Sequence, residues 1–120
     1  YGLKVQMHCC GGFEPLMPSI IDAGMDALHA VQSSCKGMDL KQLKEKYGKD
    51  IVFNGAIDSH HILIEGDTDY VHEKTKEVLD IMMPGGNFIA GASHDTILEE
   101  TPVENVLEMF NTIEKYGVYN

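Results

Sequence analysis

The sequence predicts an α/β fold built from four successive β-α units with parallel strands. The first observation behind this prediction is that short apolar runs alternate with longer segments of helical periodicity. The second is that capping residues, glycines and prolines separate the two kinds of segment. The third is that each helical segment is long enough to carry the chain back, and such crossovers make neighbouring strands parallel.

Four apolar runs are predicted to be the strands of this sheet. They are short, and they contain several β-branched or aromatic residues, which suit an extended backbone. The runs cover residues 2–8, 26–32, 51–57 and 87–92.

Two helices are expected in the first half of the chain. The segment 13–24 carries Leu16, Ile20 and Ile21 as its apolar residues and has Gly24 as its stop. The segment 39–48 begins at Asp39 as N-cap, with Gln42 in the capping-box position, and Gly48 follows its end.

Two longer helices are expected in the second half, at 68–83 and 101–117. In the first, Val71, Val78, Leu79 and Met82 share one side, and Pro84 stops the helix. In the second, Thr101 is the expected N-cap, with Pro102 at the first helical position, Glu104 completing the capping box and Gly117 at the end. Its expected buried face consists of Val103, Val106, Leu107, Phe110 and Ile113.

Two architectures fit four β-α units: a four-stranded doubly wound sheet and half of a β/α barrel, whose eight units take about 250 residues. No glycine-rich GxGxxG turn opens the first helix, which disfavours a dinucleotide site. We treat residues 1–120 as one unit, and because Tyr1 stands almost inside a strand, we expect a piece of a longer protein. A sheet of four parallel strands leaves two open edges, which favours pairing with a second copy of the chain. The alternative is that the chain is a product of proteolysis.

Charge and cysteine content exclude several classes of function. The chain has 19 acidic and 9 basic residues and a net charge of -10, which disfavours partners such as nucleic acids and anionic membranes. No apolar run approaches the roughly 18 residues of a membrane span, and no signal peptide opens the sequence. Three cysteines, an odd number, indicate reduced thiols, so we expect a cytoplasmic protein.

Side chains with metal-binding or catalytic chemistry gather after the predicted strands. Active sites of parallel α/β folds form at the carboxyl ends of the strands. The residues at these four positions are His8, Cys9 and Cys10; Gln32, Ser33, Ser34 and Cys35; Asp58, Ser59, His60 and His61; and Ser93, His94 and Asp95.

The first of these groups predicts a zinc site. Side chains alternate along a strand, so His8 and Cys10 lie on one face and can converge on one Zn²⁺ ion. A catalytic zinc has about three protein ligands, and His94 is the expected third, with Cys35 or His61 as alternatives. A structural explanation competes with this one, because cysteines near strand ends are often buried and inert. His29, inside the second strand, is interpreted as a core or lumen histidine.

Two long stretches resemble a known family. They are "HCCGGFEPLMPSIIDAGMDALHAVQSSCKGMDLKQLKEKYGKDIVFNGAID" and "PGGNFIAGASHDTILEETPVENVLEMFNTIEKYG". Both resemble the carboxyl half of the uroporphyrinogen decarboxylase superfamily, which includes decarboxylases and corrinoid-dependent methyltransferases acting on coenzyme M or related acceptors. The resemblance extends from about Leu3 to Gly117 and implies a β/α (TIM) barrel, which favours the half-barrel architecture.

The two ends of the chain resemble different branches of that superfamily. The "HCCGG" start resembles the methyltransferases, in which a His-x-Cys pair and a later cysteine bind zinc. This implies zinc ligands at His8 and Cys10, but the later cysteine would fall near Ser93 and His94, where this chain has none. Either His94 takes its place or the zinc site is altered. A histidine after the last strand is typical of the decarboxylases, and their substrate arginines and key aspartate lie in an amino-terminal half that this chain does not contain.

The methyltransferase resemblance implies a zinc-activated thiol that takes a methyl group from a corrinoid held by a partner protein. Gly11 and Gly12 would let backbone and substrate approach closely, Asp58 or Gln32 would orient a ligand or the substrate, and His94 and Asp58 are the expected catalytic residues. One alternative is cofactor-free decarboxylation of a tetrapyrrole, a lyase step of porphyrin biosynthesis. Another is a metal- or corrinoid-binding module without turnover. The chain alone is expected to be inactive.

Overall fold

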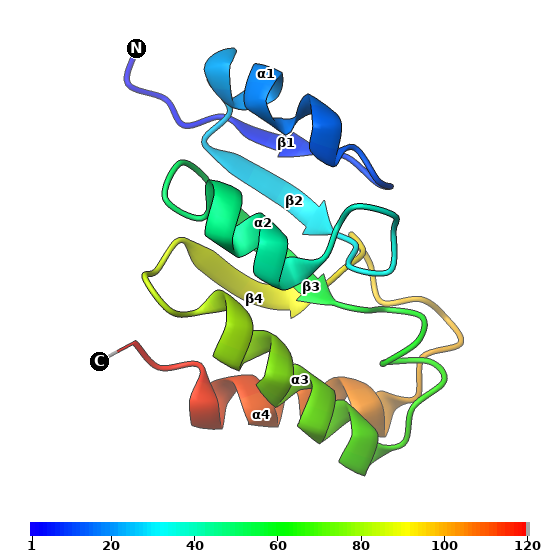
Figure 1. The fold of residues 1–120 in the computed structure, drawn as a ribbon. Helices are drawn as coiled ribbons and strands as arrows, with labels where there is room; N and C mark the ends of the chain where they lie inside the picture. The colour runs from blue at the N-terminus through cyan, green and yellow to red at the C-terminus, as the bar shows by residue number, and fades with distance from the viewer. Residues whose placement is uncertain (120) are drawn as a thin grey trace.

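The computed structural model, which describes residues 1–119, contains a four-stranded parallel sheet (Figure 1). Its strands are β1 (Gln6–His8), β2 (Ala27–Val31), β3 (Val52–Ile57) and β4 (Phe88–Ala92), and they lie in that order. Each strand therefore pairs with the next one along the chain, as in consecutive units of a β/α barrel. A doubly wound sheet reverses its strand order at a switch point, so the predicted barrel-type α/β class is confirmed.

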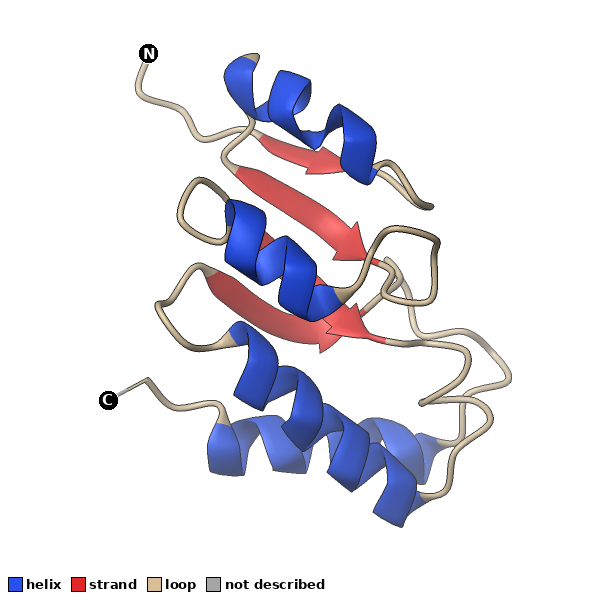
Figure 2. Ribbon diagram, in the orientation of Figure 1, coloured by secondary structure: helices blue, strands red, loops and turns tan. Residues whose placement is uncertain are grey.

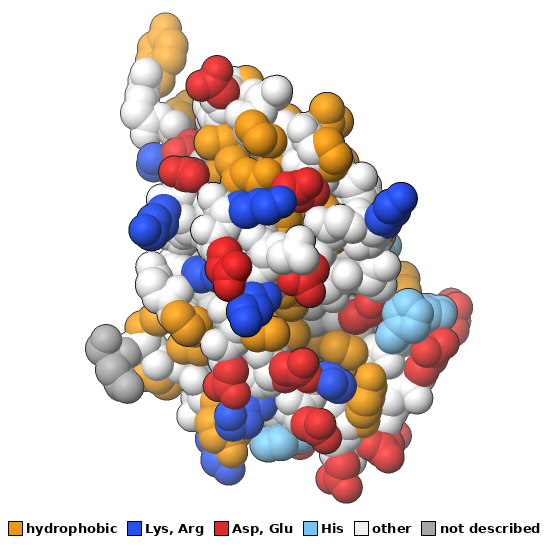
Figure 3. All heavy atoms as spheres, in the orientation of Figure 1, with side chains coloured by type: hydrophobic (Ala, Val, Ile, Leu, Met, Phe, Trp, Pro, Cys, Tyr) orange, Lys and Arg blue, Asp and Glu red, His pale blue; other side chains and the backbone are white. Residues whose placement is uncertain are grey.

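Four helices connect and follow these strands. They are α1 (Met17–Asp22), preceded by the 3₁₀ turn η1 (Glu14–Leu16), then α2 (Leu40–Tyr47), α3 (Thr68–Met82) and α4 (Val103–Tyr116). Figure 2 shows α1, α2 and α3 in chain order along one side of the sheet, with α4 next to α3. Among the described residues, no helix is long and apolar enough to cross a membrane. Figure 3 shows acidic and basic side chains interspersed over the helical face.

The first unit is shorter than predicted. Only Gln6, Met7 and His8 of the expected strand 2–8 pair with β2. The expected helix 13–24 begins as a 3₁₀ turn and ends at Asp22, with Ala23 as its C-cap. Pro15 and Pro18 occupy the first turns of these two short helices, where a missing N–H costs nothing.

Helix starts were predicted correctly in one case and wrongly in another. Asp39 caps α2 as expected, its Oδ1 accepting a hydrogen bond from the Gln42 backbone N–H at 2.9 Å. Thr101, however, does not cap the last helix. Pro102 has an extended ψ of 133° and itself takes the N-cap position, so α4 begins at Val103. The fixed φ of proline fits both positions, and the sequence pattern therefore did not distinguish them.

The core lies between the sheet and α2 and α3. Leu28 of β2 and Phe53 of β3 are completely buried, as is Leu43 of α2. The predicted inner face of α3 is confirmed, because Val71, Val78, Leu79 and Met82 are all buried. Burial of such side chains contributes about 1.5–3 kcal/mol each.

The predicted buried face of α4 is largely wrong. Val103, Leu107 and Phe110 are 69%, 58% and 57% exposed, and only Val106 and Ile113 are partly buried. The helix instead turns Asn105, Met109 and Thr112 toward the rest of the protein. Helical periodicity identifies an apolar stripe, but it does not say which element covers the stripe, and no element within residues 1–119 covers this one.

A bulge in β2 lies directly after His29. His29 pairs with Asn54, but the next paired residue, Val31, faces Gly55, so Ala30 is the additional residue. Gly55 has a φ of +115°, and a Cβ there would lie 3.1 Å from the Ala92 carbonyl oxygen. Glycine is required for this close approach. The bulge therefore lies at the carboxyl end of β2, on the edge of the sheet where the polar side chains gather.

Candidate metal-binding site

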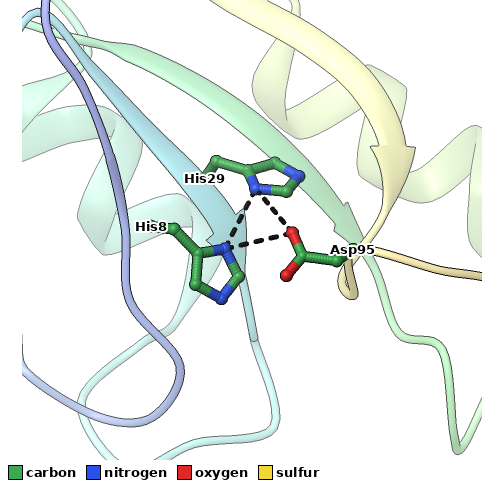
Figure 4. A group of neighbouring side chains, drawn as sticks. All are labelled: His8, His29 and Asp95. Atoms are coloured by element: carbon green, nitrogen blue, oxygen red, sulfur yellow. Dashed lines mark hydrogen bonds and ion pairs between the residues drawn. The ribbon is translucent and has the colours of Figure 1, made fainter.

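Two histidines from neighbouring strands face each other at the carboxyl edge of the sheet. His8 ends β1 and His29 lies opposite it in β2, as their parallel register shows. Residues in register point to the same face of a sheet, and the two Nδ1 atoms are accordingly 3.1 Å apart. Asp95, from the loop after β4, points its Oδ1 at the same place (Figure 4).

The carboxylate of Asp95 completes a nearly equilateral triangle of potential ligand atoms. Its Oδ1 lies 3.3 Å from Nδ1 of His8 and 3.2 Å from Nδ1 of His29. Two imidazole lone pairs and a carboxylate repel one another unless a proton or a cation lies between them. The arrangement is therefore suited to hold a positive charge.

Cys10 approaches the other nitrogen of the His8 ring. Its Sγ lies 3.3 Å from Nε2 of His8, so the two side chains share a face. In a tetrahedral zinc site with bonds of about 2.1 and 2.3 Å, nitrogen and sulfur are separated by about 3.6 Å. The His8–Cys10 pair thus also has the spacing of two ligands to one metal ion.

His94, the expected third ligand, precedes Asp95 in the chain, but its ring makes a different contact. Its Nδ1 accepts a hydrogen bond from the Thr96 backbone N–H at 3.4 Å. Within the described part of the chain, ligand atoms of three residues come within 4.8 Å of one another only at His8, His29 and Asp95. A role for His94 as ligand or catalyst stays a prediction.

Asp58 is buried, 7% exposed, and holds the turn that follows β3. Its Oδ1 accepts hydrogen bonds from the backbone N–H groups of His60 and His61, at 2.8 and 2.9 Å, and its Oδ2 faces Nδ1 of His61 at 3.1 Å. Burial acts to raise the pKa of Asp58, but these hydrogen bonds outweigh it and hold the pKa below its usual value. The hydrogen bond and charge of Asp58 in turn raise the pKa of His61.

The other expected substrate-binding residues connect the loops after β1 and β2. The side-chain oxygen of Gln32 accepts a hydrogen bond from the Gly11 backbone N–H at 3.1 Å and faces Sγ of Cys35 at 3.6 Å. A Cβ at Gly12 would collide with the Lys36 carbonyl oxygen, so that glycine allows the two loops to pack. Of the two alternative zinc ligands, His61 contacts Asp58 and Cys35 contacts Gln32.

Sequence reasoning missed the contributions of His29 and Asp95. His29 was interpreted as a core or lumen histidine, yet its side chain is 21% exposed and reaches the cluster. One signal was present: His8 and His29 stand near the ends of adjacent parallel strands, where equal register brings them together. The position of Asp95 follows from the path of a loop, which no local pattern specifies.

Comparison with known proteins extends these observations. The family described as uroporphyrinogen decarboxylase (URO-D) matches residues 1–116. Among solved structures, a methyltransferase from Methanosarcina mazei is similar, with a TM-score of 0.74 and 24% sequence identity. The similarity covers 98% of this chain and 32% of that structure, so the chain spans about a third of its length. At this identity the likeness is one of fold. No curated protein matches the chain.

Proposed function

The chain belongs to the uroporphyrinogen decarboxylase family, and from this membership we propose that it is part of an enzyme that transfers a methyl group from a methylated corrinoid to a small thiol. A corrinoid protein would present the methyl group, and a divalent metal ion, zinc by preference, would bind the thiol. The observation that carries the proposal is the group of nitrogen, sulfur and oxygen ligand atoms around His8 at the carboxyl edge of the sheet. Such donors suit zinc and related ions.

The residues around His8 supply the binding chemistry. When bound, the metal ion would stabilise the acceptor as a thiolate near neutral pH. His8 is the expected ligand common to two arrangements, because its Nδ1 faces His29 and its Nε2 faces Cys10, and a neutral ring binds an ion through only one of them. Cys10 and His94 are the further ligands that the sequence predicts. Loss of zinc binding in Cys10→Ser or His94→Gln would support this ligand set.

The neighbouring loops position these side chains. Gln32 connects Gly11, next to Cys10, to the loop after β2. Asp58 orders the adjacent turn that carries His60 and His61. Because the Asp58 carboxylate is already engaged by three hydrogen bonds, we assign it the role of a residue that shapes the rim rather than one that reacts.

The test uses the full-length protein with a methylated corrinoid and a thiol. We expect methylation of the thiol, loss of activity after treatment with a chelator, and its return when zinc is added. Decarboxylation of a porphyrinogen that is insensitive to the chelator would replace this function with the family's decarboxylase chemistry. Binding of zinc or cobalamin without methyl transfer would indicate a binding module.

A further inference from the structure

We propose that His8, His29 and Asp95 bind one first-row divalent metal ion, the two histidines through Nδ1 and the aspartate through Oδ1. This inference names the ligands of the ion in the proposed function and rests on that function only for the role of the ion in catalysis. It assigns Cys10 and His94 positions outside the ligand set.

The spacing of the three atoms matches a metal site. Their separations are 3.1, 3.2 and 3.3 Å. Ligands at about 2.1 Å from a tetrahedral ion lie about 3.4 Å from one another, so only small shifts are needed to bind one. Because three separate segments supply the atoms, the site exists only in the folded chain.

Two of the three ligands stand on paired strands, and the third follows a residue that is held by hydrogen bonds. His8 and His29 belong to paired strands, and the backbone N–H of Cys9 donates to the His29 carbonyl oxygen at 2.9 Å. Asp95 follows the buried Ser93, whose N–H donates to the Ile57 carbonyl oxygen at 2.8 Å and whose hydroxyl accepts from the Ser59 N–H at 3.0 Å. The two histidine ligands are therefore preorganised, while Asp95 lies in the exposed loop after β4.

The donor types restrict the ion. Two imidazoles and one carboxylate are typical of zinc and of non-haem Fe²⁺, whereas Mg²⁺ and Ca²⁺ prefer oxygen ligands. The side chains of His8, His29 and Asp95 are 40%, 21% and 56% exposed, so one side of the ion would remain open to a substrate. An open position is the mark of a catalytic rather than a structural site.

The His8 ring decides between this ligand set and one that contains Cys10. A neutral imidazole has one lone pair, so a metal ion at Nδ1 leaves a proton on Nε2. That N–H then points at Sγ of Cys10, 3.3 Å away, and holds the ring in place. Besides His8 itself, the Nδ1 side offers one nitrogen and one oxygen, whereas the Nε2 side offers a single sulfur.

Metal titration of the full-length protein and its variants tests the assignment. Zn²⁺ affinity is measured by competition with a chromophoric chelator for wild type, His29→Gln, Asp95→Asn and Cys10→Ser, with the exposed rim variant His60→Gln as control. We expect His29→Gln and Asp95→Asn to weaken binding by about tenfold or more. Cys10→Ser keeps an oxygen that can accept the Nε2–H of His8, so it should weaken binding less than either ligand variant. His60→Gln should stay within about threefold of wild type. Circular dichroism of each metal-free variant verifies its fold.

The visible spectrum of the Co²⁺-substituted wild type provides a test that needs no variant. A site of two nitrogens and one oxygen shows d–d bands without a sulfur-to-metal charge-transfer band, whereas a thiolate ligand adds such a band, which is intense and lies in the near ultraviolet. That band, or unchanged Zn²⁺ affinity in His29→Gln and Asp95→Asn, would overturn the ligand assignment and leave the proposed function standing. If the two variants lose Zn²⁺ binding and the wild-type protein transfers no methyl group, the ligand assignment is supported and the proposed function is rejected.

Discussion

Asp58 supplies a quantitative test of how the rim is held together, through the matched replacements Asp58→Ala and Asp58→Asn. The carboxylate accepts two backbone hydrogen bonds on Oδ1 and contacts Nδ1 of His61 through Oδ2. Hydrogen bonds to a charged group contribute about 1.5–3 kcal/mol each when buried, and less where water can take over. His60 and His61 are exposed, so the lower values apply.

At about 1 kcal/mol for each of the two backbone hydrogen bonds, and less for the contact with the exposed His61 ring, we expect Asp58→Ala to lower the free energy of unfolding by about 2–3 kcal/mol. Asp58→Asn should cost about 1 kcal/mol, because its amide oxygen can still accept both backbone N–H groups. Urea unfolding of the full-length protein measures both values. The reasoning fails if Asp58→Ala changes the free energy of unfolding by less than about 0.5 kcal/mol.

The stability difference between wild type and Asp58→Asn should depend on pH, and the shifted pKa values of Asp58 and His61 set its sign. The folded-state pKa of Asp58 is lowered, so its contribution is present above the unfolded value of about 3.9 and is lost as the pH falls through the folded value. The pKa of His61 is raised, so its smaller contribution is present below about pH 6.5 and is lost as the pH rises through the folded value. The gap between wild type and Asp58→Asn should thus be widest at about pH 4–6.5, and a gap independent of pH would contradict this explanation.

Three further replacements test the packing around the site. Asn105→Ala removes two hydrogen bonds from its buried amide to carbonyl oxygens of the loop after β3, at 2.9 and 2.7 Å, and should cost about 2 kcal/mol in urea unfolding; the exposed Asn111→Ala should cost almost nothing. Gly12→Ala should destabilise the protein by about 1–3 kcal/mol through its collision with the Lys36 carbonyl, and unchanged stability would refute that contact. Phe110→Ser replaces an exposed apolar side chain of α4 and should change the free energy of unfolding by less than about 0.5 kcal/mol, whereas a larger loss would contradict the exposed position of Phe110.

Much of the fold was predictable because its signals are local. Alternation of apolar runs with helical segments gave four β-α units, and the Asp39 cap and the buried face of α3 followed from spacing alone. The errors arose where a partner decides the outcome. The α4 stripe has correct helical periodicity, yet Phe110 is exposed because no element within residues 1–119 packs on it.

The candidate site divides in the same way. Alternation along one strand placed His8 and Cys10 on a common face, and their side chains do meet. The expectation that His94 lies at the rim came from its position after the last strand, but its neighbour Asp95 is the residue that reaches the histidines. Adjacent loop residues point in different directions, and only the path of the backbone selects between them.

By itself, the sequence determined the order of the elements, the parallel arrangement of the strands and the edge of the sheet at which reactive side chains gather. These properties follow from periodicities of a few residues and from the handedness of crossovers, which act within short stretches of chain. Tertiary structure alone decided that His29 and Asp95 join His8, because their distances depend on strand register, on the bulge after His29 and on the route of the loop after β4. Contacts between residues far apart in the chain are fixed by packing of the whole sheet, and no local pattern encodes them.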